Sequence, residues 1–202
     1  MKKILLLAVL ALALPTAVFA GSGVDYTNSG GTLSGTNSGL TLSGSTLIAV
    51  NGLNGGGLIT GNNLGSVGFS TGALTSGSLQ MGGTFAAGGW FTITGNGTNG
   101  VPNGTLFTGT FSGPVTWTLV TLANGSHNYT LVGTLSGTNG LGAATQGVTV
   151  QLTINTGKGF FNGSTSISSG DTNTVVPEPG SLSLLGTGLI GLAGVVRRKL
   201  KA

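Results

Sequence analysis

Residues 148–155 alternate strictly between apolar and polar side chains, and this alternation constrains the fold more than any other feature. The segment reads Val-Thr-Val-Gln-Leu-Thr-Ile-Asn. A period of two places the four apolar side chains on one face of a β-strand, so that one face is buried and the other meets water. We therefore expect Val148, Val150, Leu152 and Ile154 to point into the core together.

Shorter runs of the same kind predict further strands covering residues 90–91, 115–122 and 129–135. Threonine and valine favour strands, and no long stretch of the domain shows a helical period. The turn signals Gly113-Pro114 and Asn124-Gly125 separate these runs. The prediction is an all-β, antiparallel, β-sandwich-like domain.

A β-solenoid or roll is the alternative fold. The heptapeptide Gly-Thr-Leu-Ser-Gly-Thr-Asn occurs at residues 31–37 and again at 133–139, but two copies define no period. Aromatic side chains are missing from residues 27–68 and frequent in residues 69–129. The packed core should therefore lie mainly in the second half of the domain.

The first twenty residues have the pattern of a signal peptide. Lys2 and Lys3 precede an apolar run at residues 4–14. Eleven residues span about 17 Å as a helix, well short of a hydrocarbon core of about 30 Å, so a permanent anchor is disfavoured. A signal peptidase site follows at Val18, Ala20 and Gly21. Cleavage is expected between Ala20 and Gly21.

The C-terminal segment combines three signals in order. The tripeptide Pro177, Glu178 and Pro179 precedes an apolar stretch at residues 181–196. This stretch gives about 24 Å of helix, which is shorter than the hydrocarbon core of a membrane. Flanking basic side chains that reach the interface compensate for part of that difference in length. A stop-transfer cluster then keeps the tail in the cytoplasm and the domain outside: Arg197, Arg198, Lys199 and Lys201.

This arrangement resembles the PEP-CTERM sorting domain over residues 175–202. The resemblance implies recognition of Pro177, Glu178 and Pro179 by an exosortase, a membrane-embedded peptidase, followed by cleavage nearby. It also implies release to the cell surface or beyond, in association with exopolysaccharide. The expected organisation is a signal peptide, a β domain, a linker and a transmembrane helix with a basic tail: residues 1–20, 21–172, 173–180 and 181–202.

The charge of the exported part excludes nucleic acid as a partner. Residues 21–180 hold one cation, Lys158, against three acids, which gives a net charge of −2. A single lysine cannot neutralise a run of phosphates. The chain has no cysteine, which excludes disulfides and thiolate metal sites.

Titratable groups are too few to predict an enzyme. A glycosidase pair could be built only from Asp25 and Asp171, which come from the two ends of the domain sequence. A Ser-His-Asp site would need His127, which follows an Asn-Gly turn and is expected in a solvated loop. We therefore predict no catalytic residue, no cofactor and no metal site.

The aromatic side chains are the remaining residues that could indicate a binding function. Trp90, Trp117 and Tyr129 could stack on sugar rings if they were exposed, although Trp117 alternates in phase with Val115 and Leu119, as a core residue would. The prediction is a non-catalytic structural protein of the cell surface or extracellular matrix. The alternative is a carbohydrate-binding module that interacts with exopolysaccharide, for which two exposed, coplanar rings would argue.

Overall fold

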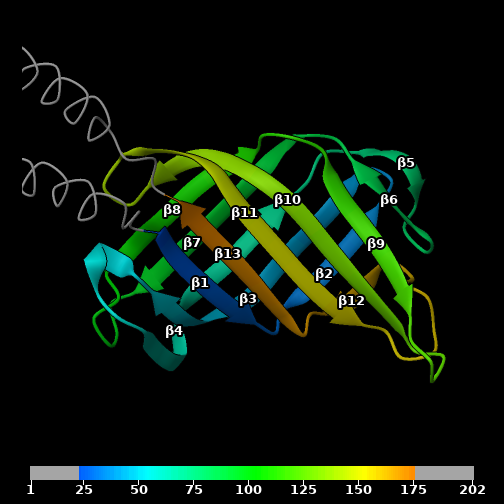
Figure 1. Ribbon diagram of the computed structural model, residues 1–202, viewed down its shortest axis with the longest axis horizontal. Helices are drawn as coiled ribbons and strands as arrows, with labels where there is room; N and C mark the ends of the chain where they lie inside the picture. Colours follow the sequence, from blue (N-terminus) through cyan, green and yellow to red (C-terminus); the bar gives the residue numbers. More distant parts are fainter. Residues whose placement is uncertain (1–22, 176–202) are drawn as a thin grey trace, which may run out of the picture. The chain divides into compact units, whose positions relative to one another are not determined.

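The computed structural model describes residues 23–175, and this part of the chain is all-β, as predicted (Figure 1). The helices predicted within residues 1–20 and 181–202 lie outside it. One 3-10 turn, η1 (Leu53–Gly55), interrupts the strands. The strands are β1 (Gly23–Ser29), β2 (Thr32–Thr36), β3 (Gly39–Asn51), β4 (Ile59–Ser70), β5 (Leu74–Ser78), β6 (Gly82–Phe85), β7 (Gly88–Asn96), β8 (Asn103–Phe111), β9 (Val115–Thr121), β10 (His127–Asn139), β11 (Ala144–Asn155), β12 (Ser164–Ser166) and β13 (Ser169–Val175).

The alternation in residues 148–155 has the predicted consequence. These residues lie in β11, and the four apolar side chains are all buried: Val148, Val150, Leu152 and Ile154. Thr149 and Gln151, which lie between them, are exposed. The predicted register of this strand is confirmed.

The strands close into an antiparallel barrel instead of packing as a sandwich. Eight strands follow one another in the order β11-β13-β1-β3-β4-β7-β8-β10, and β10 also pairs with β11. Every pairing is antiparallel. The sandwich prediction and the solenoid alternative are therefore both wrong. Alternation reports that one face of a strand is buried, and it does so equally in a sandwich and in a closed sheet.

The closure depends on the first and last strands. β1 pairs with β13 from Gly23 opposite Val175 to Asn28 opposite Gly170. The compact unit therefore extends from Gly23 to Val175, three residues beyond the predicted boundary at 172. Both ends of this unit lie at the same end of the barrel.

Two long strands change partner along their length. One edge of β10 pairs with β9 near its start and with β8 near its end. One edge of β3 likewise pairs first with β2 and then with β1. β3 and β10 are parallel to each other, so both strands start at the same end of the barrel. The groups β2–β12 and β9–β6–β5, which pair with these starts, therefore both extend the barrel at the end opposite Gly23 and Val175 (Figure 1). We call this the extension end.

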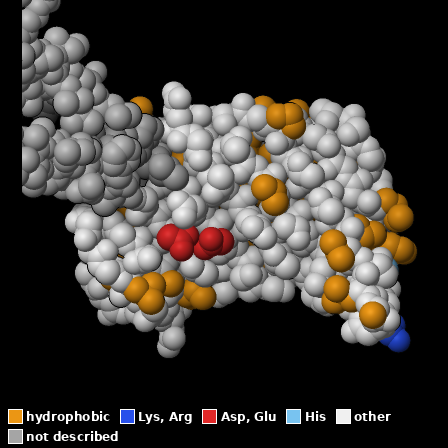
Figure 2. Space-filling model, in the orientation of Figure 1, with side chains coloured by type: hydrophobic (Ala, Val, Ile, Leu, Met, Phe, Trp, Pro, Cys, Tyr) orange, Lys and Arg blue, Asp and Glu red, His pale blue; other side chains and the backbone are white. Residues whose placement is uncertain are grey.

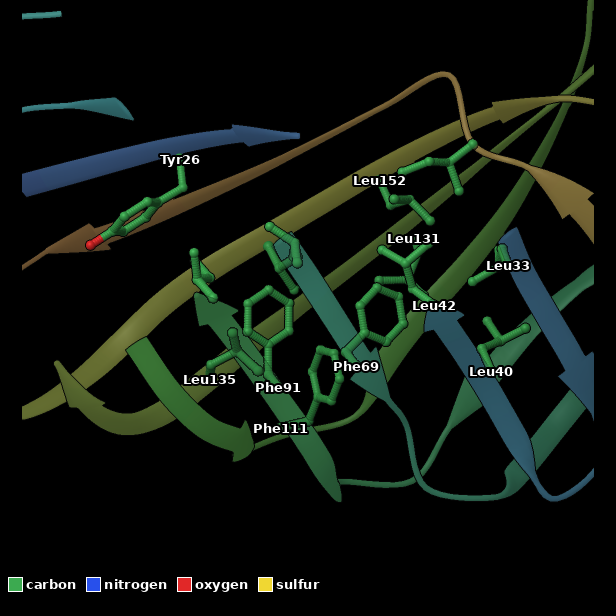
Figure 3. Packing of buried hydrophobic residues seen from close by; sticks show 14 of the residues in the cluster. Tyr26, Leu33, Leu40, Leu42, Phe69, Phe91, Phe111, Leu131, Leu135 and Leu152 are labelled. Carbon is green, nitrogen blue, oxygen red and sulfur yellow. The ribbon is translucent and has the colours of Figure 1, made fainter. Parts of the chain in front are cut away.

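The barrel is filled by side chains (Figure 3). Phe91 of β7 stacks on Phe69 of β4, with ring centroids 5.8 Å apart, and meets Phe107 and Phe111 of β8 edge-on at 6.1 and 6.2 Å. These offset and edge-to-face arrangements suit the charge distribution of aromatic rings. Aliphatic residues from both halves of the chain complete the same buried cluster, among them Leu33, Leu40, Leu42, Leu131, Leu135 and Leu152.

Gly65 shows how tightly neighbouring strands approach within the barrel. Its φ is +154°, and a Cβ at this position would lie 1.8 Å from the carbonyl oxygen of Thr94 on β7. No side chain fits in that space, so β4 requires glycine here.

Candidate functional site

The targeting residues predicted from the sequence fall outside the described part of the chain, and their assigned roles remain predictions. They form the signal peptidase site, the sorting motif and the stop-transfer cluster: Val18, Ala20, Gly21, Pro177, Glu178, Pro179, Arg197, Arg198, Lys199 and Lys201. Within residues 23–175, the structure contains no helix with the length and apolar character needed to cross a membrane.

The two aspartates of the domain lie side by side on its outer surface. Asp25 is on β1 and Asp171 is on β13, where the register places Asp171 opposite Thr27 and Asp25 opposite Asn173. The Thr27 hydroxyl donates a hydrogen bond to Asp171 Oδ1 at 3.3 Å. Figure 2 shows the carboxylates as one acidic spot (red) on a surface that is otherwise almost uncharged. The pairing of β1 with β13 thus brings together two acids that the sequence separates.

The acid pair favours the protonated form of Asp25. Partial burial raises the pKa of the Asp25 carboxyl above its ordinary value, and the charge of Asp171 and a side-chain hydrogen bond with it raise this pKa further. Asp25 Oδ1 is buried and has no hydrogen-bond partner. In residues 23–175 no group of three or more His, Cys, Asp or Glu side chains could hold a metal ion. Burial and the neighbouring carboxylate thus both favour a neutral Asp25.

His127 is not in a solvated loop, so that prediction is wrong. Asn124 Oδ1 accepts from the Ser126 backbone N–H within the Asn124-Gly125 turn, and β10 begins at His127, two residues before the predicted start of this strand at Tyr129. The side chain is buried and stacks on Phe160, with ring centroids 4.3 Å apart. Its Nδ1 lies 3.1 Å from the Gly159 carbonyl oxygen, which only accepts, so Nδ1 carries the proton.

His127 therefore fastens a loop and does not face an acid. Its backbone N–H donates to the Gly157 carbonyl, and its own carbonyl accepts from the Thr156 N–H. Asp171 pairs with Gln151, which pairs with Val132 of β10. Val132 is five residues along the strand from His127, roughly 17 Å at the rise of a β-strand. The described residues thus form no Ser-His-Asp arrangement around His127.

Two of the three predicted sugar-stacking rings are buried at the extension end. Trp117 of β9 and Tyr129 of β10 are 1% and 0% exposed, and they stack with ring centroids 4.9 Å apart. Trp117 Nε1–H donates to the Leu79 carbonyl at 2.9 Å, and the Tyr129 hydroxyl donates to the Gln80 carbonyl at 2.6 Å. Both rings have the polar partners of core residues, and neither presents a face to a ligand.

Trp90 is the exception, with 47% of its surface exposed. Its neighbour Phe91 points into the barrel, so Trp90 projects from the outer face of β7. Its ring lies over Gly68 of β4, where an added Cβ would be 3.2 Å from Cη2. The alternation of Phe91 with Ile93 already indicates this outward orientation. Nothing in the sequence pairs Trp90 with Gly68.

The segment that follows the barrel is a recognised sorting signal. Residues 175–199 match the PEP-CTERM protein-sorting motif, and the match begins at Val175, the last residue of β13. No curated protein and no solved structure matches the chain.

The chain is therefore an exported protein with a C-terminal sorting signal. That signal is of the PEP-CTERM kind, which implies transit through the membrane and processing by exosortase-type machinery.

Proposed function

We propose that the chain is a non-catalytic structural protein of the cell surface or extracellular matrix. The observation that carries this proposal is the PEP-CTERM motif, which begins at the last residue of a complete, closed domain. The sorting route then delivers one self-contained barrel as its cargo.

The route of delivery follows from the order of the signals. Signal peptidase cleaves before Gly21, and the apolar segment at residues 181–196 holds the chain in the inner membrane with the barrel outside. An exosortase-type peptidase then recognises Pro177, Glu178 and Pro179 and releases the barrel from its anchor.

Three features of the barrel support a structural role over a catalytic one. The acid pair lies on an open sheet face, His127 bonds to a backbone carbonyl, and the interior is filled by side chains. The burial of Trp117 and Tyr129 also argues against a carbohydrate-binding module built on several coplanar rings. Among residues 23–175 the charged side chains are Asp25, Lys158 and Asp171. The surface of the barrel is therefore nearly uncharged, and it is suited to contacts with uncharged partners.

Changes in the sorting motif test the proposal. Proline fixes φ and disfavours helix at the preceding residue, so the tripeptide should stay extended where a peptidase can grip it. Replacing Pro177, Glu178 and Pro179 with alanine should leave the protein uncleaved in the membrane. Glu178→Gln should slow processing without altering insertion, because a buried charge needs a cationic partner in the enzyme.

Immunoblots of cell fractions, from a host with its exosortase, measure both effects. Lys158→Ala is the matched control, since it removes a charge from an exposed loop far from the motif in the sequence, and its processing should be normal. Loss of the C-terminal tail at the normal rate in the triple-alanine variant would show that the tail is only an anchor. Retention of the cleaved wild-type domain in the periplasm would contradict the surface or matrix role.

A further inference from the structure

The two tryptophans of the chain are placed in opposite ways. Trp117 is 1% exposed and hydrogen-bonded in the core, whereas Trp90 is 47% exposed on the outer face of β7. Just over half of the Trp90 side chain is nevertheless covered by the barrel. What covers it, and what stays open, defines the surface around it.

Gly68 gives the indole of Trp90 a flat support. A Cβ built on Gly68 would lie 3.2 Å from Trp90 Cη2 and 3.3 Å from Cζ3, so the six-membered ring covers the glycine. The backbone of Gly68 is not in the left-handed region, and glycine is needed here only for space. One face of the indole thus rests on β4, and the exposure of the residue leaves the other face open to solvent.

The side chains around the indole carry hydroxyl groups and no charge. The register places Thr41, Ser70 and Trp90 in one row across β3, β4 and β7. A second row holds Gly68, Thr92 and Thr108 on β4, β7 and β8. We call this surface the Trp90 face: Thr41, Gly68, Ser70, Trp90, Thr92 and Thr108.

The four strands that form the Trp90 face contain no charged residue. The one lysine among residues 23–175 is Lys158, in the segment after β11, and the two acids are on β1 and β13. An anionic polymer would find no cation on this face to pair with, and a cationic one would find no carboxylate. Charge complementarity therefore selects an uncharged ligand.

We propose that the Trp90 face binds a neutral saccharide. A pyranose ring has an apolar C–H face, which packs on the rigid, open face of an indole, and a rim of hydroxyls. Serine and threonine hydroxyls both donate and accept hydrogen bonds, and so they match that rim without a fixed polarity. This inference rests on the proposed function, because a protein of the surface or matrix meets polysaccharide there. It adds to that function the chemical class of the partner.

Titration of the purified exported chain with soluble polysaccharides tests the inference. Dextran, mannan and a mixed-linkage β-glucan are the neutral probes, and alginate is the acidic one. Calorimetry should detect binding to at least one neutral polymer and none to alginate. Binding should also protect the exposed tryptophan from quenching by acrylamide, while Trp117 remains protected throughout.

Variants separate ligand contact from folding. Trp90→Ala should weaken binding at least tenfold, and Trp90→Phe, which keeps an aromatic face, should restore most of it. Gly68→Ala should displace the indole and weaken binding severalfold. Phe160→Ala is the matched control, because Phe160 is 46% exposed but lies in the segment after β11, and its affinity should equal that of the wild type.

Three results would overturn the inference. They are no binding to any neutral polymer, tighter binding to alginate than to the neutral polymers, and an unchanged affinity in Trp90→Ala. Thermal unfolding of each variant shows whether the barrel is intact, and Trp90→Phe decides the case if Trp90→Ala does not fold. Binding by the purified chain does not depend on localisation, so failure here leaves the sorting experiment untouched, and the reverse also holds.

Discussion

Two groups of aromatic side chains stabilise different parts of this barrel in different ways. In the middle, Phe69, Phe91, Phe107 and Phe111 pack on one another within the buried apolar cluster. At the extension end, a second group combines ring contacts with hydrogen bonds from the indole N–H, the phenol hydroxyl and one backbone N–H: Trp117, Tyr129 and Phe161. The first group holds strands together, and the second ties loops to strands.

The hydroxyl of Tyr129 shows the difference best. It donates to the Gln80 carbonyl and accepts from the Phe161 backbone N–H at 3.0 Å. One phenol oxygen thus joins the β5–β6 hairpin and the segment after β11 to the start of β10. Both groups bury their rings, and the extension end adds directional hydrogen bonds that the middle group does not make.

The largest effect should follow from Phe91→Ala. Phe91 is fully buried and has three aromatic neighbours, so truncation leaves a cavity and should lower the free energy of unfolding by about 3–5 kcal/mol. Urea denaturation of the exported chain measures it. Thr108→Ala, on the outer face of β8, should change stability by less than about 0.5 kcal/mol. Equal effects of the two changes would contradict the placement of the core.

Tyr129→Phe should have an intermediate and more local effect. It keeps the ring but leaves the Phe161 N–H, which is buried, without its partner. An unmet buried group lowers stability by about 1–3 kcal/mol. Hydrogen exchange should speed up at the Phe161 amide much more than at the Phe107 amide. Uniform acceleration across both groups would mean that the extension end is held by packing, as the middle is.

The smallest effect is a pH dependence of the folding stability, and it should come from Asp25, which belongs to neither aromatic group. The pKa of Asp25 is raised in the folded state above its ordinary value of 3.8, so the folded domain binds this proton more tightly than the unfolded chain. The resulting stabilisation is fully present below pH 3.8 and is lost as pH rises through the folded pKa. Like charges on neighbouring strands act on a scale of roughly 0.2–1 kcal/mol.

Asp25→Asn isolates that contribution. The variant should be slightly more stable than the wild type at neutral pH, and its stability should vary less between pH 3.5 and 7. Both differences should be on the order of the cross-strand effect between like charges. Urea midpoints across this range measure the difference. Phe91→Ala should keep the wild-type slope with pH at a lower overall stability, whereas an unchanged slope in Asp25→Asn would assign the pH dependence to other groups.

The sequence predicts the strands much better than their arrangement. Alternation is a local signal, and it is sufficient to predict β11 and the burial of Trp117. Closure depends on the pairing of Gly23 with Val175, for which no local signal exists. The prediction of a solvated loop for His127 is wrong for the same reason, because the burial of this side chain depends on the loop around Gly159, which is distant in the sequence. The contact of Trp90 with Gly68 likewise arises from the register of β4 against β7, which composition does not encode.

The pairing of β1 with β13 also has a consequence for the timing of export. The chain crosses the membrane with β1 early and β13 last, so the ring of strands stays open until residue 175 has emerged. Until then one edge of β1 and one edge of β11 are unpaired, and such edges invite pairing with other chains. Pairing between segments so distant in sequence is also slow to form. Because the sorting motif begins where β13 ends, the last step of folding and the display of the cleavage signal occur within a few residues of one another.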